Sequence, residues 1–138
     1  MSTPPAVGDL LGPMTIDRVD PGGLKRLAVL LADPNPIHLD PEAARRAGLG
    51  DRVVVQGPAS VGYLIDMLLA TAPGAELRDL RVRFTANVHG DDRVVAAGRV
   101  TEIDEAGGER TLACAVWVDV DGGPRALEGG ATLVLRAG

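Results

Sequence analysis

The sequence predicts a single α+β domain in which about five antiparallel strands form a sheet that wraps one long buried helix. The chain has 138 residues, which is typical of one domain. A long apolar segment with helical periodicity begins at Gly57, and four segments after Leu77 alternate apolar and polar residues between glycine-containing turns. Because a half-buried sheet must cover its apolar face, we expect the long helix to lie against it.

The N-terminal part is expected to contain a lead-in and the first strand. Residues 1–12 are rich in proline and glycine and are predicted to form a flexible lead-in. The domain itself is placed at residues 13–138. Its first strand is expected over about residues 14–19.

Two short helices are predicted to follow. Apolar residues at near-helical spacing indicate a helix over residues 24–31, which must stop soon afterwards because Pro34 and Pro36 cannot continue it. Asp40 is placed as the N-cap of the second helix, with a proline at its first position, and Gly48 ends it.

The long helix and the C-terminal strands are the clearest elements. The apolar face of the helix consists of Val61, Leu64, Ile65, Leu68 and Leu69. The strands are predicted at residues 80–88, 94–103, 111–120 and 127–135. The turns between them contain Gly90-Asp91, Gly107-Gly108 and Gly122-Gly123. Short connections of this kind predict an antiparallel meander.

Composition excludes several classes of protein. The 19 acidic residues outnumber the 14 basic ones and only three residues are aromatic, which disfavours a nucleic-acid partner. Cys114 is the single cysteine, so neither an intramolecular disulfide nor a multi-cysteine metal site is expected, and its alternating strand predicts a small buried side chain. The sequence shows neither a signal peptide nor an apolar run of about 20 residues. We therefore expect a cytoplasmic protein without a membrane partner.

The segment Asp33-Pro34-Asn35-Pro36-Ile37-His38 carries the most chemical information. Each proline favours extended geometry in the residue before it, so the backbone is stiff and irregular. A carboxylate and an imidazole held in this way can act together on one water molecule. The alternative is structural: Asp33 caps a turn, Asn35 forms an Asx-turn and His38 is a partly exposed residue at a helix entry.

The same segment, followed by Gly57 at the start of an apolar helix, resembles the signature of the MaoC-like family of (R)-specific enoyl-CoA hydratases and 3-hydroxyacyl dehydratases. Further similarities are Ala43, Gly48, Val82-Arg83-Phe84, Val88, Gly90-Asp91 and Gly98-Arg99-Val100. The resemblance spans most of the chain and implies the hot-dog fold. It also implies a hydro-lyase that catalyses reversible syn hydration of trans-2-enoyl thioesters in fatty acid or polyketide metabolism.

The resemblance assigns a role to each matching residue. Asp33 and His38 would activate the water, Asp33 by accepting its proton and His38 by exchanging a proton with C2 of the substrate. Asn35 would orient the pair. The backbone N–H of Gly57 would bind the thioester carbonyl, with Ala59 as a less favoured second donor, because developing negative charge suits a helix N-terminus.

The resemblance also implies what accompanies the enzyme. Neither a metal nor a redox cofactor is expected, and coenzyme A or acyl carrier pantetheine would enter as part of the substrate. A homodimer is expected by analogy with the family. A subunit of a hetero-oligomeric hot-dog dehydratase is an alternative, and so is an acyl-CoA thioesterase that uses Asp66 of the long helix.

Four further residues are candidates for substrate binding. Gln56 precedes the helix glycine, where the family commonly has histidine, and Tyr63 could line an acyl tunnel or simply pack in the helix. Arg81 and Arg83 share one strand face and could meet coenzyme A phosphates or face solvent. The group from His89 to Asp92 is expected to form a turn and not a metal site.

Overall fold

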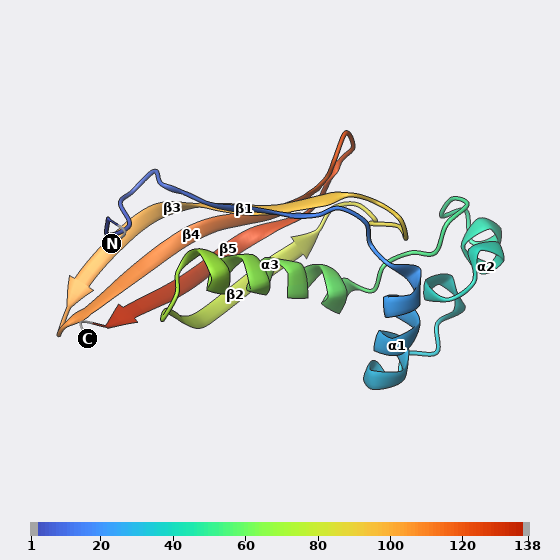
Figure 1. Ribbon diagram of the computed structural model, residues 1–138, viewed down its shortest axis with the longest axis horizontal. Helices are drawn as coiled ribbons and strands as arrows, with labels where there is room; N and C mark the ends of the chain where they lie inside the picture. The colour runs from blue at the N-terminus through green and yellow to red at the C-terminus, as the bar shows by residue number, and fades with distance from the viewer. Residues whose placement is uncertain (1–2, 137–138) are drawn as a thin grey trace.

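One five-stranded sheet and one long helix dominate the computed structural model, which describes residues 3–136 (Figure 1). The elements are β1 (Leu10–Ile16), α1 (Pro21–Leu31), the 3₁₀ helix η1 (Pro36–His38), α2 (Pro41–Arg46), α3 (Gly57–Thr71), β2 (Glu76–Phe84), β3 (Val94–Ala106), β4 (Glu109–Val120) and β5 (Arg125–Arg136). Residues 1–2 of the expected lead-in and residues 137–138 of the expected domain lie outside the described residues.

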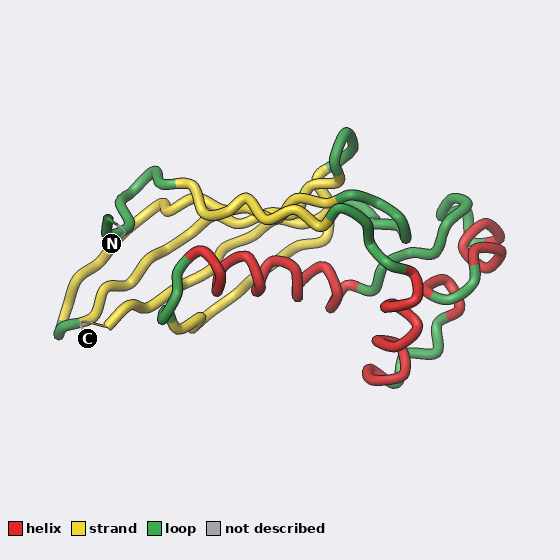
Figure 2. Tube along the Cα trace, viewed as in Figure 1, coloured by secondary structure: helices red, strands yellow, loops and turns green. Residues whose placement is uncertain are grey.

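The sheet has the order β1-β3-β4-β5-β2, and every neighbouring pair is antiparallel. Helix α3 packs along one face of this curved layer and contacts β1, β2, β3 and β4 (Figure 2). The centre of α3 is inaccessible to solvent, with Leu64, Met67 and Leu68 all 0% exposed. These side chains meet Leu112 and Leu133 of the sheet in one core. The predicted α+β fold with one long buried helix is confirmed.

The helix starts follow from their caps. Helix α1 begins at Pro21, earlier than expected, because the Asp20 carboxylate accepts a hydrogen bond from the N–H of Gly22 (2.9 Å). The predicted cap of α2 is confirmed, since Asp40 accepts from the N–H of Glu42 (3.0 Å). Helix α3 begins at Gly57 as expected. Among the helices within residues 3–136, none is long and apolar enough to cross a membrane.

The pairing of β2 corrects the expected meander. Strands β3, β4 and β5 are consecutive neighbours, but β2 pairs with β5 at the opposite edge from β1. The segment after β2 is not a tight hairpin, because it is bonded to residues 53–55: His89 forms a bridge with Val54, and the N–H of Val55 donates to the carbonyl of Val88 (2.8 Å). The chain therefore crosses the sheet before β3 begins beside β1.

Strand boundaries also differ from the sequence expectation at the N-terminus. Strand β1 includes residues 10–12, where the sequence predicts the lead-in, and ends at Ile16. The predicted turn at Gly107-Gly108 is confirmed as a two-residue hairpin between Ala106 and Glu109. Both glycines have positive φ values, 59° and 78°, as a type I′ turn requires.

Helices α1 and α2 lie beyond the N-terminal end of α3, away from the sheet (Figure 1). The polar segment from Asp33 to His38 belongs to this outlying region, between α1 and α2. The buried α3 and the outlying helices therefore meet where the N-terminus of α3 begins, and the candidate site lies at that junction.

Candidate active site

Two consecutive Asx-turns fix the segment between α1 and α2. The Asp33 Oδ1 atom accepts a hydrogen bond from the N–H of Asn35 (3.1 Å), and the Asn35 Oδ1 atom accepts from the N–H of Ile37 (3.2 Å). The N–H of His38 then donates to the carbonyl of Asn35 (3.2 Å), which forms η1. The structural interpretation of the motif is therefore correct for its backbone, and the turns also determine where the side chains lie.

The turns bring Asp33 and His38 together. Their Oδ2 and Nε2 atoms are 3.5 Å apart, with the side chains 33% and 12% exposed respectively. The other ring nitrogen of His38, Nδ1, lies 2.6 Å from the carbonyl oxygen of Val54. Because a carbonyl oxygen can only accept, Nδ1 carries a hydrogen, and Nε2 is the ring nitrogen that faces Asp33. Oδ2 and Nε2 can thus hold one water molecule between them.

Asn35 supports this pair through the backbone. Its side-chain oxygen is used as the N-cap of η1, and the helix that it caps carries His38 at its end. No hydrogen bond among the described residues joins the side-chain amide of Asn35 to either member of the pair. The side chain therefore positions the imidazole by holding the turn.

A cavity of about 300 Å³ adjoins the imidazole. His38, Gly57 and Ser60 line it together with apolar side chains that include Phe84 and Leu127. Asp33 instead lines a groove of about 660 Å³ along α1, whose other walls are mostly apolar. Because Asp33 and His38 are 3.5 Å apart, the pair stands where the cavity and the groove approach each other.

The N-terminus of α3 supplies a hydrogen-bond donor to the cavity. Gly57 is the first residue of the helix, so its N–H has no intrahelical acceptor. Pro58 has no N–H, and the N–H of Ala59 donates to the carbonyl of Gln56 (3.0 Å). The suggested second donor Ala59 is therefore engaged within the chain, and Gly57 is the backbone donor that remains.

The absence of a side chain at Gly57 keeps the approach to this donor open. A Cβ atom at this position would lie 3.0 Å from Cζ of Phe84. The Phe84 ring thus lies beside Gly57, and a side chain at this position would be crowded against it. The positive end of the helix dipole faces the same space, which favours an oxygen atom that gains negative charge.

Gln56 is buried and occupies a different place from the one expected for a substrate-binding residue. It is 1% exposed, and its Nε2 atom donates to the carbonyl of Leu24 (2.9 Å). Its Oε1 atom has no hydrogen-bond partner among the described residues. Gln56 does not line the cavity beside His38 and instead joins α1 to the start of α3.

The structure does not bring Tyr63, Arg81 or Arg83 to the pair. Tyr63 lines a separate cavity of about 470 Å³ with Asp66, and burial raises its pKa. Arg81 and Arg83 lie on the exposed face of β2 and form ion pairs with Asp79 (3.2 Å) and Glu128 (3.0 Å). A role for the two arginines in binding phosphate stays a prediction.

Ser60 was missed by the sequence reasoning. Ser60 lies in a helix whose pattern is mostly apolar, so the pattern predicts packing and does not single out this residue. Its spacing of three residues from Gly57 is the signal that places both residues on one helix face. The structure buries Ser60 to 4% exposure and places it in the wall of the cavity that His38 and Gly57 share.

The other polar clusters are paired internally. His89 forms the expected turn, with its N–H donating to the Asp92 carboxylate (2.9 Å) and its Nε2 atom 2.7 Å from the carbonyl of Leu49. Within residues 3–136, no group of three His, Cys, Asp or Glu side chains is arranged to hold a metal ion.

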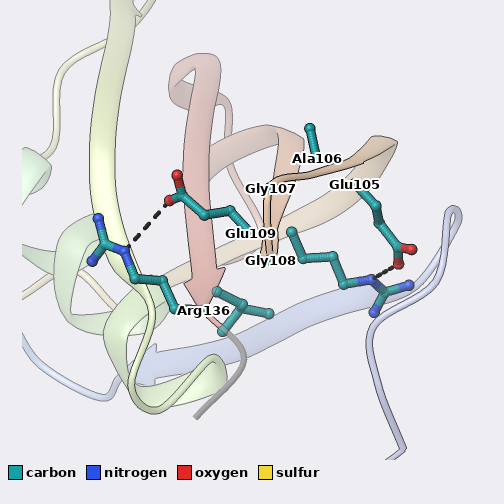
Figure 3. A pocket seen from close by; sticks show the side chains of 8 residues that line it. Glu105, Ala106, Gly107, Gly108, Glu109 and Arg136 are labelled. Carbon is teal, nitrogen blue, oxygen red and sulfur yellow. Dashed lines mark hydrogen bonds and ion pairs between the residues drawn. The ribbon is translucent and has the colours of Figure 1, made fainter.

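A cavity of about 500 Å³ at the β3–β4 hairpin is also lined by charged side chains (Figure 3). Glu109 faces Arg136 (3.4 Å) and Glu105 faces Arg110 (2.7 Å). The hairpin lies at the opposite end of the molecule from α1 and α2 (Figure 1). This cavity is therefore remote from the Asp33–His38 pair, and its charges are already matched.

An antiparallel five-stranded sheet wrapped around one long helix is the hot-dog fold. The family model described as MaoC like domain matches residues 13–120. The chain therefore belongs to the MaoC-like hydratase and dehydratase family. A search of curated proteins found no match.

Solved structures show the same fold. The MaoC-like dehydratase from Rhodospirillum rubrum superposes with a TM-score of 0.83 at 21% identity, covering 96% of this chain and 94% of that chain. The (R)-hydratase from A. caviae involved in PHA biosynthesis superposes with a TM-score of 0.80 at 24% identity, covering 99% of this chain and 100% of that chain. A chain of the ChsH1-ChsH2 complex from Mycobacterium tuberculosis superposes with a TM-score of 0.78 at 18% identity, covering 96% of this chain and 98% of that chain.

Proposed function

We propose that this protein catalyses the reversible syn hydration of trans-2-enoyl thioesters to (R)-3-hydroxyacyl thioesters. The observation that carries the proposal is the 3.5 Å approach of Asp33 Oδ2 and His38 Nε2. The pair adjoins a cavity that also contains Gly57, whose N–H is free to bind a carbonyl oxygen. Acid–base chemistry and carbonyl polarisation are the two components that addition of water to an enoyl thioester requires.

The geometry supports a defined path for the proton. A water molecule held between Oδ2 and Nε2 attacks C3 of the substrate while its proton passes to Asp33. The proton then moves to Nε2 of His38, which delivers it to C2, so both groups return to their starting states. Because the hydroxyl and the proton arrive from the same side of the double bond, the addition is syn.

Negative charge develops on the thioester oxygen between these two steps. The Gly57 N–H at the start of α3 stabilises this enolate, and the aligned helix dipole adds to the effect. Dehydration uses the same groups in reverse. The proposed chemistry needs no metal or redox cofactor, and coenzyme A or an acyl carrier pantetheine is part of the substrate.

The proposed assembly is a homodimer. Strand β2 is at an edge of the sheet, and an exposed edge strand is a site for pairing with another chain. A complex with a different hot-dog chain is the alternative, favoured by the two-chain complex among the similar structures. If the purified chain hydrates substrate only after a second hot-dog chain is added, the hetero-oligomer is the correct assembly.

The test measures loss of the enoyl thioester absorbance with crotonyl-CoA. We expect Asp33→Asn and His38→Ala to abolish hydration while circular dichroism and the melting temperature stay near the wild-type values. Asp66→Asn is the matched control, because this carboxylate lines the separate cavity beside Tyr63. Full activity in both dyad variants would overturn the assignment.

A free-thiol assay on the same samples tests the thioesterase alternative. Hydration leaves the thioester intact, so the wild-type protein should release no coenzyme A from acyl-CoA. Thiol release that depends on Asp66 would instead identify a thioesterase.

A further inference from the structure

Ser60 is a buried polar residue near the start of α3, and it has no role in the reaction proposed above. It is 4% exposed and lines the cavity of about 300 Å³ with His38 and Gly57. No hydrogen bond among residues 3–136 uses its Oγ atom. A hydroxyl group without a protein partner in the largely apolar wall of a cavity is available to a ligand atom that accepts its hydrogen bond.

The neighbouring donors leave this position to Ser60. Gly57 and Ser60 are three residues apart and therefore lie on the same side of the helix. Pro58 cannot donate, and the N–H of Ala59 is bonded to the carbonyl of Gln56 (3.0 Å). The Gly57 N–H and the Ser60 hydroxyl are thus the two donors at the beginning of α3 that have no partner among the described residues and that belong to residues lining the cavity.

We propose that the Ser60 hydroxyl is a second hydrogen-bond donor to the thioester carbonyl oxygen, acting with the Gly57 N–H. This inference rests on the proposed function. The hydroxyl donates a hydrogen bond that strengthens as C1 oxygen gains enolate character, and it transfers no proton. Ser60 is then a catalytic residue that touches the substrate, whereas Asn35 acts only through the position of His38.

The first measurement is the hydration of crotonyl-CoA by Ser60→Ala. Removal of one donor from an oxyanion site lowers kcat by roughly 100- to 1000-fold, and we expect a loss approaching this range with a much smaller change in KM. A merely structural role would instead appear as a lower melting temperature. The separation of kcat from KM and from stability therefore identifies the donor.

The matched pair Ser60→Thr and Ser60→Val isolates the hydroxyl group. The two replacement side chains have the same branched shape, so any packing effect on the helix is shared. We expect the threonine variant to be at least tenfold faster than the valine variant, following the loss of one oxyanion donor. Equal rates for the two variants would overturn the proposal.

A spectroscopic measurement supplies a readout that is independent of turnover. The absorption band of a bound cinnamoyl thioester moves to longer wavelength when its carbonyl oxygen accepts hydrogen bonds. We expect this shift with the wild-type and threonine proteins and a smaller shift with the alanine and valine proteins. An identical shift in all four proteins contradicts the proposed role of Ser60 but leaves the proposed function standing. A wild-type protein that hydrates no enoyl thioester contradicts the proposed function itself.

Discussion

Replacement of Gly57 by alanine tests the carbonyl-binding site with a single methyl group. The Cβ atom would lie 3.0 Å from Cζ and 3.4 Å from Cε1 of Phe84. The ring must therefore retreat by a few tenths of an ångström. Because Phe84 is 54% exposed, the ring can move into solvent, and the free energy of unfolding should change by no more than about 1 kcal/mol.

The effect on catalysis should be much larger than the effect on stability. In the proposed reaction the substrate oxygen approaches the helix N–H, and the methyl group adds bulk beside that N–H. A displaced carbonyl loses its preorganised donor, so we expect kcat with crotonyl-CoA to fall about 100-fold. The measurement combines initial rates from the enoyl absorbance with thermal unfolding followed by circular dichroism.

Gly62→Ala is the matched control in the same helix. A Cβ atom at Gly62 meets no heavy atom within 4 Å, and alanine in a helix interior is more stable than glycine by about 0.5–1 kcal/mol. The control should therefore keep wild-type activity and unfold at a slightly higher temperature. If Gly57→Ala also keeps the wild-type rate, the carbonyl does not bind at this helix terminus.

Three further changes test the positioning, packing and ionisation that the structure shows. Asn35→Ala removes the cap of η1, which is worth about 1 kcal/mol, and should lower kcat roughly fivefold because His38 is held less firmly. Asn35→Asp keeps a capping oxygen and should restore the rate. Equal losses in both variants would indicate that the side-chain amide contacts the substrate directly. Gly129→Ala places a Cβ atom 1.8 Å from a backbone oxygen of β2 and should strongly destabilise the sheet, as measured by denaturant titration. Gly130→Ala, whose Cβ atom would lie 3.6 Å from its nearest neighbour, should fold normally. Equal stability of the two variants would refute the β2–β5 register. Burial raises the pKa of the Cys114 thiol from 9.0 to about 11, so the stability that the neutral thiol contributes is complete below pH 9.0 and falls by about 2–3 kcal/mol as the pH rises to about 11. The difference in unfolding free energy between wild type and Cys114→Ala should change in this interval. A difference that stays constant with pH would refute the raised pKa.

The sequence contains enough information to predict most of the elements and the stiff turn that carries Asp33 and His38, because both depend on local chemistry. The acid–base roles of the two side chains come from the family resemblance and stay a prediction. The apolar periodicity after Gly57 requires a buried helix, and Asp40 followed by proline specifies a helix start. The prolines at 34 and 36 similarly restrict the backbone between Asp33 and His38. The two side chains meet in the structure because short-range turns set the course of the backbone between them, while the contact of Nδ1 with the carbonyl of Val54 fixes the imidazole ring.

The remaining features depend on tertiary pairing, which local patterns do not encode. Alternation identifies β2 as a strand but does not determine that β5 and not β3 is its neighbour. The burial of Gln56 depends on the carbonyl of Leu24, which α1 supplies from a distant position in the chain. Ser60 likewise becomes a candidate only when the outlying helices bring His38 to the same cavity.

The position of the imidazole depends on the backbone of one residue, Val54, in the segment between α2 and α3. Val54 donates its N–H to the carbonyl of Ile37 (2.9 Å) and accepts from Nδ1 of His38 (2.6 Å), so its two backbone groups fix both the turn and the ring. The next residue, Val55, donates to Val88 in the segment that joins β2 to β3 (2.8 Å). The imidazole is therefore connected to the sheet by a short chain of backbone hydrogen bonds, whereas Gly57 is fixed by a helix that belongs to the core. Because local opening of an exposed turn needs less free energy than global unfolding, the exposed turn from Asp33 to His38 makes the alignment of His38 with the helix N-terminus the part of the site most sensitive to changes outside the core.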